Sequence, residues 1–562
     1  MSVMDGRQRL GLLDLPAELL VSTWAHLPNR DIKSLRLTCS HFRDTTTLRL
    51  DRIFLSANPR NIEVFCAVAT HDVYRRQIKE LIYDDARLKE YTHDYRFVRR
   101  QAEARGLRFS PPPPEEAGCP PSYDEACRQN IEDLEMRKQY DADRPDHQQR
   151  ARRLAAVLKT RDSWEIYQEL RRQQEEVIQM GSDIECLRKA LTANWFPSLK
   201  RVTITPAAHG MLFNPLYETP MIRAFPFGFN YAMARGWPVF THRSNTSIKM
   251  PAWDEEEEQS KEQWRGFRLV TDLLAHISNH SVSELNIDVS QLMTGINCRI
   301  FDQPYAEQES LAKLLRRPGF ERIDLALMVG GQEHVGWPAF RSGHLRRTLA
   351  EAPDLKHVSL RTDNQEIDPD VSTRWLNEPD CHFVPLRTVF PVDRWLHLSH
   401  FGLGHFIVKQ LDLTSLLSAL PALRSVEFFC LMFLEGSHRG LLEDMRDTLG
   451  WRQRIPEARV RIAFGLEAQP CSSPERKVWI DREVSDFVYG AGENPFMPDS
   501  GRNVVSTGKG VIRDPFEPAH ERPNVAIFDL VRLGYCTSEW VEGMIRNGNL
   551  SAELDDPPTY IP

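Results

Sequence analysis

Segments whose residue types and spacing could do chemistry are few in this 562-residue chain. The best candidate for a phosphate site is GRNVVSTGKGV (501–511), because phosphate-binding loops combine a glycine-rich turn with Gly-Lys and a following serine or threonine. Its first glycine lies too far from the Gly-Lys pair, and Gly510 stands where the magnesium-binding hydroxyl is needed. YGAGENP (489–495) has two glycines but no helical pattern after them. Neither segment predicts a nucleotide site.

The nearest approach to a metal-ligand or catalytic histidine cluster is WLHLSHFGLGHF (395–406), which contains His397, His400 and His405. Histidines at this spacing can share a metal ion only with further ligands, and none is evident around them. No H-E-x-x-H, G-x-S-x-G or C-x-x-C motif occurs in the chain. We interpret these histidines as core or surface residues. The sequence therefore predicts a protein that is not an enzyme and that holds no metal or cofactor.

The bulk composition excludes several classes of partner. A net charge of −8 provides no overall positive field for nucleic acid or an anionic membrane. The longest apolar run, Phe428–Leu434, is far too short to span a bilayer, and the first residues lack a signal-peptide pattern. Ten cysteines occur without a C-x-x-C pair, which suits a reducing compartment. We expect a cytoplasmic or nuclear protein that binds neither nucleic acid nor membrane.

The stretch DLPAELLVSTWAHLPNRDIKSLRLTCSHFR (14–43) predicts two short amphipathic helices. Pro16 suits the first turn of the first helix, and Pro28 ends that helix. Apolar side chains recur at helical spacing on each helix, and two such helices cannot enclose both stripes. Leaving a large apolar side chain exposed costs about 1.5–3 kcal/mol. The stripes must therefore pack on the rest of the chain or on a partner.

The same stretch resembles an F-box, whose pattern matches here at Leu15, Pro16, Glu18, Leu19, Leu20, Leu27, Asp31, Ile32, Leu35, Cys39 and Phe42. Residues 50–88, 401–428, 439–451 and 484–496 also resemble parts of a large group of filamentous-fungal F-box proteins. An F-box implies docking to the Skp-type adaptor of cullin–RING ubiquitin ligases, which covers the apolar stripe. The resemblance implies these adaptor-binding residues: Leu15, Pro16, Glu18, Leu19, Leu20, Trp24, Leu27, Ile32, Leu35, Cys39 and Phe42.

A short unit with the spacing apolar-x-x-apolar-x-apolar recurs after Trp195. Several copies follow an amphipathic helical stretch, a pattern typical of stacked α/β repeats. Alternate residues such as Val358 and Leu360 are expected in the core, with His357 and Arg361 on the opposite face. The unit resembles a leucine-rich repeat but lacks its asparagine or cysteine. The copies are LKRVTI (199–204), VSELNI (282–287), FERIDL (320–325), LKHVSL (355–360), VKQLDL (408–413) and LRSVEF (423–428).

The predicted fold class is α/β (α+β), with an N-terminal helical F-box and helical region followed by an irregular leucine-rich-repeat-like α/β solenoid. An ordinary α/β sandwich is the alternative. The expected segments are an F-box (8–55), a helical extension (56–109), a proline-rich linker or loop (110–125), a charged helical segment (126–194), an irregular repeat region (195–465) and a loop-rich C-terminal cap (466–562).

Two functions fit these expectations. In the first, the chain is the substrate-recognition subunit of a Skp–cullin–F-box ubiquitin ligase and captures an unknown protein target with its repeats. In the second, it is an adaptor-bound scaffolding F-box protein without a degraded target. For the first function we expect target contacts from outward strand residues, although a charged row can simply be a solvated face. The candidates, whose acidic excess favours a basic or polar target segment, are Glu284, Asp288, Asp324, Arg361, Asp412 and Glu427.

Overall fold

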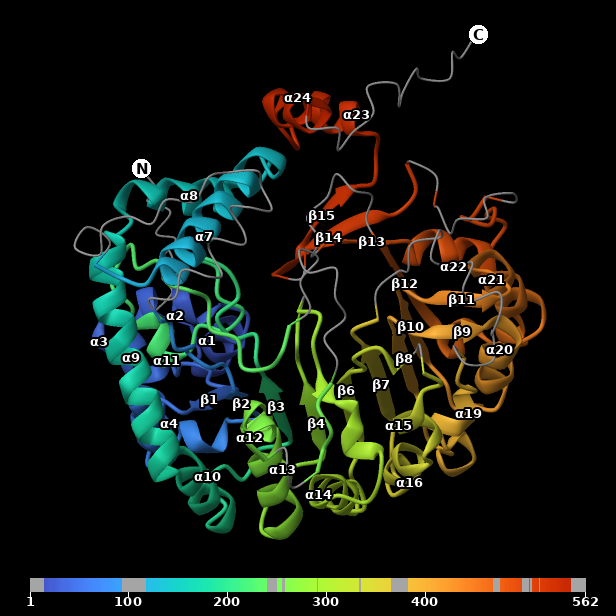
Figure 1. Cartoon of the computed structure of the whole chain (residues 1–562), viewed down its shortest axis with the longest axis horizontal. Coiled ribbons are helices and arrows are strands. Elements are labelled where there is room, and N and C mark those ends of the chain that lie inside the picture. The colour runs from blue at the N-terminus through green and yellow to red at the C-terminus, as the bar shows by residue number, and fades with distance from the viewer. Residues whose placement is uncertain are drawn as a thin grey trace, which may run out of the picture.

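The structure is a computed structural model, and it confirms a mixed α/β fold. One long, mostly parallel sheet is accompanied by many helices (Figure 1). The structure describes residues 15–92, 118–239, 250–254, 258–290, 292–332, 335–364, 383–467, 476–497, 505, 508–514 and 516–546.

A 13-stranded sheet runs through the molecule with its strands in chain order from β1 to β15. Pairing is parallel from β1 to β12 and antiparallel from β12 to β15. β5 pairs with β6 beside this path, and β9 and β11 form a separate two-stranded sheet. The strands are β1 (Arg52–Ser56), β2 (Glu80–Asp84), β3 (Arg201–Thr205), β4 (Glu284–Ile287), β5 (Ile296–Asn297), β6 (Arg322–Met328), β7 (His357–Thr362), β8 (His400–Gly404), β9 (Ile407–Lys409), β10 (Ser425–Phe429), β11 (Met432–Glu435), β12 (Arg461–Glu467), β13 (Lys477–Trp479), β14 (Val511–Asp514) and β15 (Glu517–Pro523).

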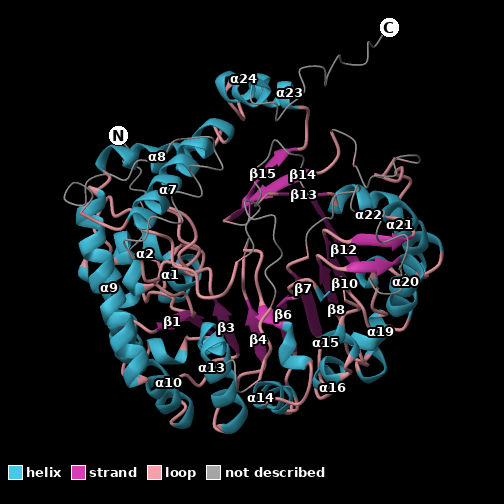
Figure 2. Ribbon diagram, in the orientation of Figure 1, coloured by secondary structure: helices cyan, strands magenta, loops and turns pink. Residues whose placement is uncertain are grey.

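Most helices between successive parallel strands lie on the outer side of an arc whose inner side is the sheet (Figure 2). Such crossovers are required because parallel strands cannot be joined by a tight turn. The first helices are α1 (Ala17–Trp24), α2 (Asn29–Arg36), α3 (Ser40–Thr45), α4 (Pro59–Ala69), α7 (Pro121–Tyr140), α8 (Pro145–Arg152), α9 (Thr160–Met180), α10 (Ser182–Thr192), α11 (Pro220–Arg223) and α12 (Glu258–Lys261). The others are α13 (Arg265–His276), α14 (Ala306–Leu315), α15 (Pro338–Arg341), α16 (His344–Ala350), α19 (Leu386–Val389), α20 (Gln410–Ser418), α21 (His438–Asp447), α22 (Asp481–Tyr489), α23 (Ile527–Arg532) and α24 (Ser538–Arg546).

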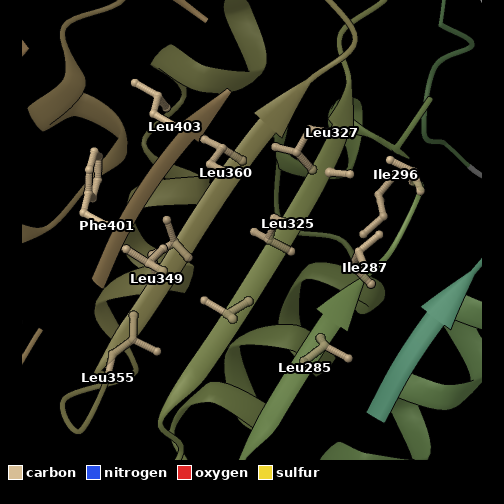
Figure 3. Packing of buried hydrophobic residues seen from close by; sticks show 14 of the residues in the cluster. Leu285, Ile287, Ile296, Leu325, Leu327, Leu349, Leu355, Leu360, Phe401 and Leu403 are labelled. Atoms are coloured by element: carbon tan, nitrogen blue, oxygen red, sulfur yellow. The ribbon is translucent and has the colours of Figure 1, made fainter. Parts of the chain in front are cut away.

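The repeated unit places equivalent residues side by side in the sheet. Val358 of β7 pairs with Ile323 of β6 and with Phe401 of β8. Burial alternates along β7 as predicted: Val358 and Leu360 are buried, whereas His357 and Arg361 are partly exposed. Figure 3 shows how residues such as Leu360 and Leu403 pack together between the strands and the helices. The hydrophobic core is therefore continuous along the arc.

The prediction of a strand at VKQLDL (408–413) is wrong, because most of this segment lies in helix α20. Leu413, Leu416 and Leu417 are buried at helical spacing, so the apolar pattern continues with the period of a helix beyond the predicted strand. The strand between β7 and β10 is β8 instead. Its segment LSHFGL (398–403) also follows the apolar-x-x-apolar-x-apolar spacing.

The predicted helical extension (56–109) also needs correction, because it contains strand β2 as well as helix α4. All five residues of β2 are buried, so its sequence lacks the alternation that marks a strand with one solvated face. The predicted linker (110–125) needs correction too. Cys119 is buried and α7 begins at Pro121, while residues 110–117 lie outside the described part of the chain.

The C-terminal segment contains the strands β13–β15, which extend the same sheet, and it returns to the helices that precede β3. The backbone N–H of Ala142 donates to the carbonyl of Tyr535, 3.0 Å away, and that of Thr537 donates to Gln139 at 2.9 Å. Tyr140 and Trp540 share a small apolar cluster at this junction. The predicted loop-rich cap therefore joins the two ends of the arc (Figure 1).

Candidate interaction surfaces

The N-terminal helices α1–α3 form a module with a small core of its own. Leu20, Trp24 and Phe42 are buried together, and the ring of Trp24 meets that of Phe42 edge to face with 5.4 Å between centroids. Ile32 is also buried. The prediction of two helices over 14–43 needs correction, because a third helix, α3, begins at Ser40 and supplies the Phe42 ring that packs on Trp24.

The other half of the α1 surface stays in solvent. Leu19 exposes 55% of its area and Val21 exposes 60%, and Pro16 and Glu18 are exposed beside them. A cluster of exposed apolar side chains on a short helix is unfavourable in water and is typical of an interaction surface. We call Pro16, Leu19 and Val21 the module surface. Of the predicted adaptor-binding residues, the structure places Leu20, Trp24, Ile32 and Phe42 inside the module, Leu15, Leu27, Leu35 and Cys39 at its margin, and Pro16, Glu18 and Leu19 outside.

A second surface is the inner face of the sheet, opposite the helices. One row of residues crosses this face because each is the Cα partner of the next. We call it the charged row: Arg52, Glu80, Arg201, Glu284, Arg322, His357, His400, Ser425 and Arg461. Oppositely charged neighbours pair along it, as in Arg52–Glu80 at 2.8 Å and Arg201–Glu284 at 2.6 Å. The row is thus mixed in sign.

Most members of the charged row were missed among the predicted target residues, although the sequence carries a signal for them. In each strand a polar residue stands directly before the second apolar residue of the unit, as His357 stands before Val358. Because the strands are parallel and in phase, these polar positions become neighbours. The predicted target residues are mostly acidic and do not include the cationic residues that pair with them, such as Arg201 and Arg322.

Two of the predicted target residues already have cationic partners. Asp324 accepts from His357 at 2.7 Å and from Arg322 at 2.6 Å. Although burial opposes it, the His357 bond and the nearby cations hold the pKa of Asp324 below its usual value. Glu284 is paired with Arg201. These pairs reduce the acidic excess that favoured a basic target segment.

Three further predicted residues lie on or beside the inner face: Glu427 is in one row with Asp324, and Asp288 and Arg361 lie nearer the carboxyl-terminal ends of the strands. Asp288 accepts from the hydroxyl of Tyr217 at 2.6 Å and from the backbone of Ser290. Arg361 donates to the carbonyl of Ser290 at 2.8 Å. The side chain of Glu427 is exposed at the surface. The surrounding protein nevertheless excludes part of the solvent around its carboxylate, and this desolvation raises the pKa of Glu427. Tyr217 also contacts Phe54, so the segment after β3 covers one end of the inner face.

Asp412 does not belong to the inner face. It lies on helix α20, and its carboxylate accepts from the backbone N–H of Leu386 at 2.7 Å. This bond caps the short helix α19. The placement of Asp412 on the target face is therefore wrong, and it follows from the wrong strand prediction at 408–413.

A buried ionic cluster fastens the C-terminal segment to the helices α7 and α8. Asp141 pairs with Arg476 and lies 2.8 Å from Nδ1 of His147. Arg144 pairs with Asp514. The carboxylates and guanidinium groups of these pairs are nearly or completely buried, and Asp141 has a lowered pKa because His147 and Arg476 outweigh the opposing effect of burial. The expected charged helical segment (126–194) did not include this cluster, because the partners Arg476 and Asp514 lie far along the chain.

The three histidines of the 395–406 segment do not form one site. His397 is exposed, His400 points to the inner face and accepts or donates at 2.8 Å with the hydroxyl of Ser425, and His405 is buried at the end of β8. The phosphate-loop candidate falls mostly outside the described residues. Its last residue, Val511, begins strand β14, whereas a phosphate loop is followed by a helix.

Neither the protein-family models nor the curated proteins include a relative of this chain. In the described part of the chain, no group of three or more His, Cys, Asp or Glu side chains could hold a metal ion. None of the helices described is long and apolar enough to cross a membrane.

Proposed function

We propose that this chain is the non-catalytic substrate-recognition subunit of a Skp–cullin–F-box (cullin–RING) ubiquitin ligase. The N-terminal module docks to a Skp-type adaptor, and the inner face of the sheet holds a protein target. Such a subunit acts by proximity, because it raises the effective concentration of target lysines near the activated ubiquitin. The proposal places the protein in the cytoplasm or nucleus, where that machinery works.

The observation that carries the proposal is that the N-terminal helices bury some of their apolar side chains in a core and expose others to water. Leu20, Trp24 and Phe42 close a small core, so the module has a defined shape before any partner binds. Pro16, Leu19 and Val21 remain in water on its outside. Both features suit the F-box pattern of the sequence, whose exposed apolar side chains serve the adaptor.

For the repeat region we propose an irregular leucine-rich-repeat-like solenoid. Parallel strands in chain order, each followed by an outer helix, support this interpretation. In such an arrangement the inner face is the natural surface for a large partner, because outer positions are filled by helices. The exposed members of that face include Arg461 and Glu427, which carry opposite charges.

Adaptor binding is tested by co-purification of the full chain with a Skp-type adaptor and cullin. Leu19→Asp places a charge on the module surface without touching the buried core, and we expect it to weaken adaptor capture by about tenfold or more. Val73→Asp is the matched control, because Val73 is a comparably exposed apolar residue outside the module, at 48%. Equal capture of the adaptor by wild type and Leu19→Asp would refute the proposal.

The scaffolding alternative predicts adaptor binding without a degraded target. Proximity labelling with wild type and with Glu427→Lys/Arg461→Glu identifies proteins held at the inner face. Glu185→Lys/Arg188→Glu reverses the charges of two exposed residues on the outer helix α10 and serves as the control. If the chain is a substrate receptor, labelled proteins should be lost with Glu427→Lys/Arg461→Glu but not with the control variant. The same proteins should accumulate in cells that carry Leu19→Asp. Labelling that depends on the inner face but no accumulation favours the scaffold.

A further inference from the structure

Two thiols lie next to each other between helices α4 and α10, which pack against one another (Figure 1). Cys66 of α4 and Cys186 of α10 are 120 positions apart in the sequence, yet their Sγ atoms are only 3.3 Å apart. Both are free cysteines in the structure. In a disulfide the two sulfur atoms are about 2.0 Å apart. A small displacement of the two side chains therefore brings these sulfur atoms within bonding range.

The packing around the two thiols holds them in place but leaves room for this displacement. Cys186 belongs to the large hydrophobic core, and Cys66 packs against the same core from its margin. Phe65 and Leu187, which follow or precede the two cysteines in the chain, line one small cavity. A cavity means that the side chains around it are not fully close-packed. The two sulfur atoms can therefore approach each other without a change of fold.

The two thiols differ in their access to solvent. Cys66 is partly exposed, whereas Cys186 exposes only 7% of its surface. Burial, followed by the contact with Cys66, raises the pKa of Cys186 to about 12. Because the thiolate is the reactive form, Cys186 is inert toward an oxidant in solution. Cys66 is therefore the thiol that a dissolved oxidant attacks first, and Cys186 is the thiol that can react with the product.

We propose that Cys66 and Cys186 form a redox site, which hydrogen peroxide oxidises to a disulfide between α4 and α10. Sγ of Cys66 first attacks one peroxide oxygen, so that an S–O bond forms and the O–O bond breaks. The hydroxide that leaves takes up the thiol proton and becomes water, and Cys66 becomes a sulfenic acid. Sγ of Cys186 then displaces the hydroxyl group, so that the S–S bond forms and the S–O bond breaks.

The overall reaction is balanced without a further reactant. The proton of Cys186 leaves with the displaced hydroxyl group as a second water molecule. The two thiols together lose two electrons, and one hydrogen peroxide is reduced to two water molecules. A dithiol reductant reverses the change by thiol–disulfide exchange. The site does not depend on the proposed ligase function.

The disulfide closes a long loop of the chain. The segment between Cys66 and Cys186 contains β2 and the helices α7–α9. A cross-link restricts the unfolded chain more strongly when the loop that it closes is longer. In a compartment that keeps thiols reduced, such bonds are transient and are typical of redox sensing. Oxidation thus stabilises this part of the arc, and reduction removes the effect.

The first test is mass spectrometry of the purified full chain, which is reduced, freed of reductant and exposed to a small excess of hydrogen peroxide. Remaining thiols are then blocked, and the chain is digested with trypsin under non-reducing conditions. Cys66 and Cys186 are the only cysteines of the tryptic peptides 61–75 and 173–188. We expect these two peptides, linked to each other, to be the main disulfide product. The linked pair should disappear after treatment with dithiothreitol.

Single variants distinguish the roles of the two thiols. Cys186→Ala should leave Cys66 as a sulfenic acid, which dimedone traps, whereas wild type should show little trapping because Cys186 consumes this intermediate. Cys66→Ala should form no linked pair and leave Cys186 unmodified. Cys430→Ala is the matched control, because Cys430 is also a partly exposed cysteine. It should form the linked pair as readily as wild type.

Thermal unfolding measures the effect of the bond on the fold. Oxidised wild type and oxidised Cys430→Ala should melt about 3 °C or more above their reduced forms. Cys66→Ala and Cys186→Ala should melt at the same temperature with and without peroxide. The proposal fails if wild type forms no linked pair, or forms other disulfides as readily. It also fails if peroxide converts Cys66 to its sulfinic acid instead, or if the linked pair forms without a rise in melting temperature.

Discussion

The imidazole rings of His357 and His400 stack face to face on neighbouring strands of the inner face, with 3.9 Å between their centroids and 6° between their planes. They are paired residues of β7 and β8. Asp324 binds His357 on one side, and Ser425 binds His400 on the other. Equivalent positions of successive units thus become a continuous set of contacts.

This stack predicts a loss of stability in mild acid. Burial, followed by His357, Arg322 and Arg461, lowers the pKa of His400 to about 4. Between that pH and about 6.5 the unfolded chain takes up a proton that the folded chain does not, so stability falls as the pH falls, by at most about 3 kcal/mol. His400→Phe keeps a ring on His357 but cannot titrate, and urea unfolding between pH 4.5 and 7.5 should show a shallower dependence. His397→Gln, at an exposed position, should keep the wild-type slope.

Asp84 predicts the opposite pH dependence. It is buried at the end of β2, where its carboxylate accepts from the backbone of Ala86, and burial raises its pKa to about 7. The unfolded carboxyl ionises near pH 4, so the folded state loses stability as the pH rises from there to 7. Asp84→Asn should therefore stabilise the protein at pH 8, by at most about 4 kcal/mol, and much less at pH 4. Asp272→Asn on the exposed side of α13 provides the comparison, and an equal gain there would contradict this account.

The buried ionic cluster that joins the ends of the arc should make the protein sensitive to a single substitution that removes one of its charges. Asp141→Asn leaves Arg476 and His147 without their carboxylate in a buried position. Breaking a buried pair from one side typically costs about 3–5 kcal/mol. Chemical unfolding should show this loss, and hydrogen exchange should increase first in α24. Glu169→Gln removes the exposed partner of Arg172 and should leave the free energy of unfolding almost unchanged, because water screens an exposed pair. Similar losses for both variants would contradict a structural role for the cluster.

Gly404 is required by the ring of Phe429. Gly404→Ala introduces a methyl group within 2.6 Å of that ring and should destabilise the protein by about 1–3 kcal/mol. Gly543→Ala in helix α24 meets nothing within 4 Å and should stabilise it by about 0.5–1 kcal/mol. Differential scanning calorimetry of both variants checks the contrast. A neutral Gly404→Ala would mean that the Phe429 ring does not need its observed position.

The α/β class and most strands of the repeat region could be predicted because alternating burial leaves a local pattern. Val358 and Leu360 alternate with polar neighbours, and the same spacing recurs at the correct strand in five of the six predicted units: β3, β4, β6, β7 and β10. The prediction failed at VKQLDL (408–413), because Leu413 fits the spacing of the strand unit and also the helical spacing of α20. A few residues cannot distinguish the two periods, and packing against neighbouring helices decides.

The residue types of the inner face follow from local spacing, but their partners do not. The contacts of Asp324 with His357, of Arg476 with Asp141, and of Arg361 and His405 with Phe429 depend on strand register and on the path of long connections. These relationships join residues far apart in the chain. Short-range propensity carries no information about them, because the contacts exist only after the parallel strands have aligned and the core has closed around them.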